Sequence, residues 1–198
     1  MYILGADKLR DDVRWKFGTP PSGNANYAWI LHMLSKLNPT NGVAGFLLAN
    51  GALGDSDTAD IREQLIKNDK VEAIIILPRE LFITTDISVT LWILNQNKKG
   101  GNYHGRNLRN REGEILFMDL RRWVDNPVKN EGKKKVLLDD AQIQRAADIH
   151  HTWQSEGTDG TNYEEPELYR SVGIDEIKAN VNNNLPEWVE VEDSSIGQ

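Results

Sequence analysis

The sequence has no cysteine among its 198 residues. This absence excludes disulfide bonds and metal sites built from thiolates, and it fits a reducing compartment. No apolar run is long enough to cross a bilayer, and the first residues lack the basic stretch and long apolar core of a signal peptide. We therefore expect a cytoplasmic protein with no membrane partner and with one main hydrophobic core.

Basic residues are fewer than acidic residues, 23 against 30, and they are most concentrated in the middle of the chain. The formal net charge of −7 argues against free-standing, non-specific DNA binding, which depends on Lys and Arg. Residues 98–135 nevertheless carry eleven Lys and Arg against five acids, whereas residues 139–198 carry fourteen acids against three bases. The two segments indicate either two different partner surfaces or two solvated, flexible segments.

Hydrophobic periodicity predicts an α/β organisation. A helix is expected over 26–37, and the continuous apolar run 43–49 predicts a strand buried on both faces. A helix over 57–67, capped by Asp57, leads to a second buried strand over 71–77. This strand–helix–strand unit predicts a right-handed parallel crossover.

The second half of the sequence is less regular. A third strand over 87–95 follows so short a connection that it is expected to run antiparallel to the preceding strand. Asp139 and Gln142 form a capping-box pattern that begins a helix over 139–154. Between the third strand and this helix we expect a mobile basic loop over 96–113, a strand over 114–120 and a polar basic segment over 121–136. After the helix we expect an acidic linker over 155–168, a short helix over 175–181 and a short strand over 188–191.

Three segments in order resemble one family. They are Arg14-Trp15-Lys16-Phe17-Gly18-Thr19-Pro20-Pro21-Ser22-Gly23-Asn24-Ala25-Asn26-Tyr27-Ala28-Trp29, the stretch from Gly42 to Gly51, and Leu77-Pro78 through Leu81-Phe82 to Leu91-Trp92-Ile93-Leu94. Their sequences are similar to those of the modification (M) subunit of type I restriction-modification systems, an N6-adenine DNA methyltransferase. The resemblance implies an α/β fold: the C-terminal half of a class I (Rossmann-like) methyltransferase sheet over 1–136, with an antiparallel strand, and a helical, acidic C-terminal extension over 137–198.

Two elements that such methyltransferases need are missing. The sequence has no Gly-x-Gly to cradle S-adenosylmethionine and no Asn-Pro-Pro-Phe to receive a flipped adenine. Thr19-Pro20-Pro21-Ser22 resembles the second motif only superficially, because Thr replaces Asn and Ser replaces the aromatic residue. We therefore expect no catalytic residue here. S-adenosylmethionine belongs to the intact enzyme, and this fragment alone is expected to be inactive and to bind no cofactor.

The resemblance leaves supporting residues as candidates for the site. Asn24, Asn26 and Tyr27 open a predicted helix and are candidates to line the adenine cleft or position DNA; the alternative is a helix cap with Tyr27 packed in the core. Asn50 follows a strand at its carboxyl end, where open α/β sheets bind ligands, or else only makes loop hydrogen bonds. In the basic loop, the candidates for contacts with the DNA backbone are Lys98, Lys99, Arg106, Arg109 and Arg111. A disordered connection is the alternative for that loop.

The adjacent histidines His150 and His151 do not predict a metal site, since no nearby acid or histidine pattern completes one. The resemblance implies other partners: the specificity (S) subunit, contacted by 139–154 and 182–189, the restriction (R) subunit, double-stranded DNA, and the upstream part of the M subunit. Two further hypotheses stay open. One is a non-catalytic, methyltransferase-derived module that binds a specificity subunit or DNA, and the other is an unrelated α/β enzyme.

Overall fold

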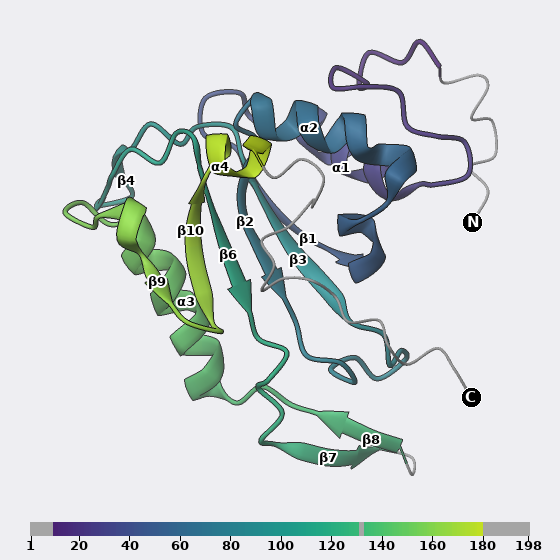
Figure 1. Cartoon of the computed structure of the whole chain (residues 1–198), viewed down its shortest axis with the longest axis vertical. Helices are drawn as coiled ribbons and strands as arrows, with labels where there is room; N and C mark the ends of the chain where they lie inside the picture. Colours follow the sequence, from purple (N-terminus) through teal and green to yellow (C-terminus); the bar gives the residue numbers. More distant parts are fainter. Residues whose placement is uncertain (1–9, 131–132, 180–198) are drawn as a thin grey trace.

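The computed structural model describes residues 10–130 and 133–179 and is centred on one six-stranded sheet (Figure 1). The strand order is β1-β3-β2-β6-β10-β9. All neighbouring pairs run antiparallel except β2 and β6, which run parallel. The strands of this sheet are β1 (Val43–Ala49), β2 (Val71–Ile76), β3 (Val89–Asn95), β6 (Glu114–Asp119), β9 (Glu164–Glu165) and β10 (Tyr169–Gly173).

Helices cover both faces of the sheet. On one face α1 (Asn26–Lys36) and α2 (Ala59–Lys67) pack with alternate residues of the strands in one core cluster. On the other face α3 (Asp140–Gln154) covers β2, β6 and β10 through the buried Ile149 and Trp153. The short α4 (Ile174–Ala179) follows β10. None of the helices in 10–130 and 133–179 is long and apolar enough to span a membrane.

The first strand is not buried on both faces, so this prediction is wrong. Residues 44, 46 and 48 of β1 face the first core cluster, but residues 43, 45, 47 and 49 are exposed. Val43 is 50% exposed and Leu47 45% exposed. The reason is that β1 lies at the edge of the sheet with β3 as its single neighbour, and α3 does not reach across to it.

The third strand runs in the predicted direction, but its position between β1 and β2 in the sheet was not predicted. It runs antiparallel to β2, as expected, with Ile76 paired to Thr90. It also runs antiparallel to β1, with Ala49 paired to Val89. Consequently β1 and β2 run in the same direction, as the crossover through α2 requires, but β3 separates them. The buried strand β2 is confirmed, since all six of its residues are buried.

The predicted helices agree with the structure except at one cap. Asp139 accepts the backbone N–H of Gln142 at 2.8 Å and the Gln142 side chain accepts the Asp139 N–H at 3.1 Å, which confirms the capping box of α3. Asp57 does not cap α2. It lies in the 3₁₀ turn η3 (Ser56–Thr58), and α2 begins only at Ala59, after an N-cap residue without a side-chain hydrogen bond.

Several elements were not predicted. The basic loop contains a hairpin of β4 (Gly101–Tyr103) and β5 (Arg106–Leu108), and the polar segment 121–136 contains a hairpin of β7 (Pro127–Asn130) and β8 (Lys133–Val136). Two 3₁₀ turns, η2 (Asn50–Leu53) and η4 (Gly160–Asn162), and the strand β10 were also missed. The strand expected at 188–191 lies outside the described residues.

Candidate functional site

The two groups of predicted site residues lie at opposite ends of the sheet. Asn50 follows the carboxyl end of β1, and α1 begins at the same end. The basic loop leaves the sheet after Asn95, which pairs with Val43 at the other end of β1. Since β3 has seven residues, the two ends are separated by roughly 20 Å. One local site therefore cannot include both groups.

Tyr27 is the buried centre of the group at the carboxyl end. Its side chain is 0% exposed, and its hydroxyl donates to the Ala52 carbonyl at 2.9 Å. Its ring meets Trp92 edge-on at 6.0 Å between centroids. Burial raises the pKa of Tyr27 well above its ordinary value. The phenol is thus a neutral donor that joins α1 to the loop after β1.

The two asparagines at the start of α1 differ in their roles. Asn24 donates from Nδ2 to the carboxylate of Asp55, and its Oδ1 accepts the backbone N–H of Asn26 at 3.1 Å. Asn26 is the first residue of α1 and is half-buried. Asn24 therefore organises the helix start and connects it to the same loop that Tyr27 holds.

Asn50 is 8% exposed and is joined to β3 and to the residue just before it. Its backbone N–H donates to the Ser88 carbonyl at 3.1 Å, and its Oδ1 accepts the hydroxyl of Thr90 at 2.7 Å. Its amide nitrogen donates to none of the residues that the structure describes. Asn24, Tyr27 and Asn50 thus meet around the loop over 50–55, and Asn26 lies beside them. Their role in lining an adenine cleft stays a prediction.

Arg62 is the residue of this group that the sequence analysis missed. It extends from α2 with 7% exposure and donates from Nη1 to the Asp55 carbonyl at 2.7 Å and to the Thr58 hydroxyl at 2.9 Å. Its guanidinium lies 5.8 Å from the centre of the Tyr27 ring. The sequence could have indicated a buried arginine, because Arg62 lies between the inward-facing Ile61 and Leu65 on a short helix. Arg62 fixes the loop and supplies no group suited to bond cleavage.

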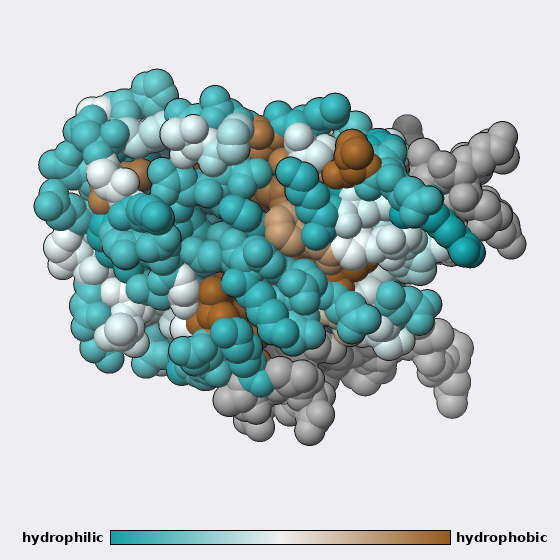
Figure 2. All heavy atoms as spheres, turned by 90° about the horizontal axis from the view of Figure 1, so that it is seen from above, coloured by the Kyte–Doolittle hydropathy of each residue, from teal (hydrophilic) through white to brown (hydrophobic). Residues whose placement is uncertain are grey.

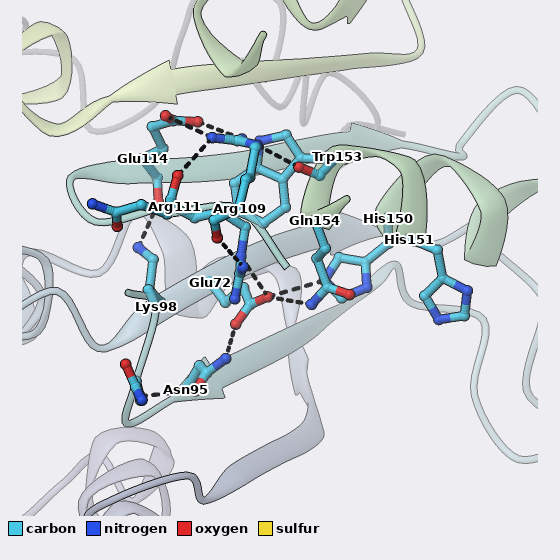
Figure 3. A network of polar contacts seen from close by, with 12 residues as sticks. Glu72, Asn95, Lys98, Arg109, Arg111, Glu114, His150, His151, Trp153 and Gln154 are labelled. Carbon is cyan, nitrogen blue, oxygen red and sulfur yellow. Dashed lines mark hydrogen bonds and ion pairs between the residues drawn. The ribbon is translucent and has the colours of Figure 1, made fainter. Parts of the chain in front are cut away.

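At the opposite end a buried polar network joins the sheet to α3 (Figure 3). Its centre is Glu72 of β2, which is 0% exposed. Asn95 and Gln154 donate to its carboxylate, Gln154 at 2.5 Å, and the His150 Nε2 lies 3.6 Å away. Burial alone would raise the pKa of Glu72, but the His150 ring and the charge of Arg111 outweigh it and bring the pKa to about 2. Glu72 is therefore a buried carboxylate anion.

Three of the five cations predicted at the DNA backbone belong to this network. Lys98, with a fully buried side chain, donates to Asp69 and to two backbone carbonyls. Arg111 is 1% exposed, with Nε 3.5 Å from Glu72. Arg109 forms a two-pronged pair with Glu114, at 2.9 and 2.7 Å. Burial lowers the pKa of Lys98, and its contact with Asp69 opposes that shift.

The other two cations remain at the surface. Lys99 has a side chain 74% exposed and lies 4.0 Å from Glu112, while Arg106 is exposed on β5 and reaches Gln154 at 3.3 Å. Figure 2 views the molecule from above, and this face is mostly hydrophilic with small apolar patches. Contact with DNA stays a prediction for all five residues. In the structure, however, Lys98, Arg109 and Arg111 hold α3 and the β4–β5 hairpin on the sheet.

No metal centre is evident in the described part of the chain. No group of three or more His, Asp or Glu side chains within 10–130 and 133–179 could hold an ion. His150 faces Glu72, and burial lowers the pKa of its neighbour His151. The described residues around Asn50 likewise contain no nucleophile paired with a base. What this site offers is a rigid loop, held by Tyr27, Asn24 and Arg62, at the carboxyl end of an edge strand.

Solved structures share the fold of this chain. The methyltransferase subunit of a type I restriction-modification system from Streptococcus thermophilus matches 93% of the chain, and 34% of its own length, with a TM-score of 0.71 and 22% identity. The type I restriction enzyme EcoKI M protein matches 85% of the chain, and 38% of its own length, with a TM-score of 0.58 and 15% identity. At these identities the likeness concerns the fold alone.

The sequence gives the family directly. The model of the N-6 DNA Methylase family matches residues 3–195, and the chain belongs to this family. It is 39% identical over 177 residues to the HindI methylase subunit of a type I restriction enzyme from Haemophilus influenzae, covering 88% of this chain. The MjaIX methylase subunit of Methanocaldococcus jannaschii is 33% identical over 176 residues, covering 86% of this chain. The chain spans about a third of the length of these relatives, 35% and 29% respectively.

Proposed function

We propose that this chain is the C-terminal part of the M subunit of a type I restriction-modification system, a site-specific adenine-N6 DNA methyltransferase. In the intact enzyme it completes the class I methyltransferase sheet and lines the cleft for a flipped adenine, while S-adenosylmethionine is bound by residues outside this chain. The family match and the two methylase subunits support the assignment. The absence of Gly-x-Gly and Asn-Pro-Pro-Phe from the sequence supports the proposal that cofactor binding and catalysis depend on residues outside this chain.

The observation that carries the proposal is the unpaired edge of β1. This strand is apolar throughout, yet it has one neighbour and one uncovered face. An apolar edge of this kind is a template for a further strand. Asn50 stands at its carboxyl end, where open α/β sheets bind their ligands, and its amide nitrogen has no acceptor among the described residues. A strand added beside β1 would place the reacting groups next to Asn50.

The residues of this chain have supporting roles in the proposed cleft. Asn50 faces the bound base, and Asn24, Asn26 and Tyr27 hold the loop beside it through Asp55 and Ala52. None of them transfers a proton or a methyl group. S-adenosylmethionine supplies the methyl group when it is bound in the intact enzyme, and no residue of this chain is expected to hold it alone.

The segment over 137–198 is proposed to contact the specificity subunit, while DNA and the restriction subunit bind the assembled enzyme. Leu137 and Ile143, at the start of α3, are 52% and 53% exposed and form the apolar part of this surface. The remainder of α3 is fixed to the sheet by Trp153, whose indole N–H donates to the Ser171 hydroxyl at 2.9 Å. The docking surface is therefore the first turn of α3, which the sheet leaves uncovered.

Reconstitution tests this function. The chain alone is expected to show no heat of S-adenosylmethionine binding in calorimetry and no methyl transfer to DNA. Together with a polypeptide made of the remaining part of the Haemophilus influenzae relative and a specificity subunit, it is expected to transfer methyl groups to adenine. Tight cofactor binding by the chain alone, or failure to complement, would overturn the proposal. Methyl transfer without the upstream part would also overturn the proposal, because the catalytic motif is assigned to that part.

A non-catalytic module that binds a specificity subunit or DNA is the second candidate, because the same missing motifs favour it. The module and the methyltransferase fragment differ in whether β1 pairs with a further strand. A module in its final form would keep β1 as an edge, so that Leu47→Lys would leave its partner binding unchanged. In the methyltransferase, Leu47→Lys on the uncovered face is expected to prevent co-purification with the upstream part, whereas Leu137→Lys, at a leucine of similar exposure, is not.

A further inference from the structure

The β7–β8 hairpin shares an end of the sheet with Asn50. It follows β6, whose last residue, Asp119, pairs with Ile76 at the carboxyl end of β2. The loop from β2 to β3 lies at this end too, and its Ser88 accepts the backbone N–H of Asn50. In Figure 1 the hairpin projects beyond the sheet at the bottom, away from the β4–β5 hairpin at the top. The β7–β8 hairpin thus lies at the same end of the sheet as the proposed cleft, whereas β4–β5 lies at the other.

The register of this hairpin places one lysine opposite another. Lys129 pairs with Lys134, and Asn130 pairs with Lys133. Like charges placed directly opposite each other on two strands destabilise a hairpin, so its own folding does not account for this pattern. Lys134 is exposed, and it forms no ion pair with any residue in the described ranges.

The arginines just before the hairpin behave differently. Arg121 pairs with Asp119 at 2.6 Å, and Arg122 pairs with Glu167. Within the hairpin Lys135 is likewise paired, with Asp86, whereas Lys134 is paired with none of the described residues. The positive charge of Lys134 therefore remains available to an anion outside the described residues.

The hairpin is held in place from one side. The buried ammonium of Lys135 donates to the Phe82 carbonyl at 2.9 Å and to the Asp86 carboxylate, and the N–H of Val136 donates to the Glu80 carbonyl at 3.2 Å. An isolated two-stranded hairpin is marginally stable, so these contacts determine its position. Since Lys134 precedes Lys135 on the strand, its side chain leaves the opposite face of the ribbon.

We propose that the β7–β8 hairpin binds the phosphate backbone of duplex DNA next to the cleft. The proposal rests on the proposed function, which brings DNA to the carboxyl end of β1. A two-stranded ribbon is narrow enough for the major groove, and lysine contacts to phosphates position a protein on a duplex without reading its sequence. We assign this role to Lys134, because the basic loop lies at the far end of the sheet.

The test compares two exposed lysines, one at each end of the sheet. Binding of the chain to a fluorescently labelled duplex is followed by anisotropy over a series of low salt concentrations. Lys134→Gln is expected to weaken binding roughly three- to ten-fold and to lower the slope of log K against log salt by about one, whatever the DNA sequence. Lys99→Gln removes the same charge at the opposite end and is expected to leave both values unchanged. Lys134→Arg is expected to restore both.

Three outcomes would overturn the inference: no binding of the unaltered chain at low salt, equal effects of Lys134→Gln and Lys99→Gln, or binding to anionic lipid vesicles with the same dependence on Lys134. A DNA titration monitored by NMR gives a second measure, in which the amide signals of β8 should shift and those of β4 should not. If the reconstituted enzyme transfers methyl groups and the Lys134→Gln variant binds DNA with normal affinity, this inference alone is overturned. Failed reconstitution with DNA binding that depends on Lys134 would overturn the proposed function alone.

Discussion

The hydroxyl of Tyr27 donates to the carbonyl of Ala52 at 2.9 Å and so joins the first turn of α1 to the loop that follows β1. Both residues are almost completely buried, at 0% and 1% exposure. The same carbonyl lies 3.5 Å from Nη1 of Arg62 on α2. Two helices therefore determine where this loop stands, and the shape of the proposed cleft depends on core packing.

Replacing Tyr27 by Phe tests this link. Tyr27→Phe keeps the ring packed against Trp92 and removes only the hydroxyl, so we expect a loss of about 1 kcal/mol in the free energy of unfolding, measured in urea. Tyr103→Phe is the matched control, because Tyr103 is 43% exposed on β4, and it should leave stability unchanged. Equal effects of the two substitutions would contradict the role assigned to Tyr27.

The buried carboxylate of Glu72 makes stability depend on pH. Its pKa of about 2 lies below the ordinary value of 4.5, so its stabilising contribution is present above about pH 4.5 and is lost as the pH falls towards 2. Glu72→Gln should therefore cost roughly 3 kcal/mol at neutral pH, and the difference from the unaltered chain should shrink in acid. Urea unfolding over a pH series measures this.

The control for Glu72 is Glu112→Gln, which removes a carboxylate with a side chain 45% exposed. It should leave the free energy of unfolding nearly unchanged at every pH. A Glu72→Gln variant as stable as the unaltered chain at pH 7 would show that the network is replaceable by neutral hydrogen bonds.

The uncovered edge of β1 predicts self-association. Exposed apolar strand edges pair with other chains, so the isolated chain should sediment as dimers or larger species at high concentration. Leu47→Lys places a charge on the uncovered face and should return the chain to a monomer. Leu137→Lys, at a leucine 52% exposed elsewhere, should not. Sedimentation velocity distinguishes these outcomes, and a clean monomer of the unaltered chain at high concentration would contradict the prediction.

The capping box of α3 predicts a modest, local effect. Asp139→Ala removes the acceptor for the N–H of Gln142 and should lower the free energy of unfolding by about 1 kcal/mol. Asp140→Ala changes the next residue, which lies in the first turn without capping it, and should cost only a few tenths of a kcal/mol. Thermal unfolding of the two variants side by side provides the comparison.

Local signals in the sequence predicted the elements whose formation is local. The apolar run over 71–76 indicated a buried strand, and Asp139 with Gln142 indicated the start of α3; the structure confirms both. The hairpins and β10 were missed because their residues do not alternate between polar and apolar. In β8 three lysines follow one another, and Lys135 is buried only because Asp86 and two carbonyls receive it.

The candidate site was predictable in part. Asn24, Tyr27 and Asn50 were candidates for one cleft, and the structure places them around one loop. The basic loop lies at the other end of the sheet, and the antiparallel direction predicted for β3 already implied this. That position depends on β3 running back between β1 and β2. One sign was present in the sequence, since Glu72 interrupts an apolar run and a buried charge needs a buried partner. Lys98 and Arg111 are the cations that its surroundings required.

The place of β3 between β1 and β2 has a consequence for the order in which the molecule assembles. β1 and β2 are complete by residue 76, yet they do not pair with each other, and β1 has no hydrogen-bonded strand neighbour in this sheet until residues 89–95 have been synthesised. The central pairing thus depends on contacts distant in sequence, which slow folding. A ribosome-bound chain that ends before Val89 would therefore hold two unpaired apolar strands, and chaperone demand should fall sharply once Asn95 has emerged.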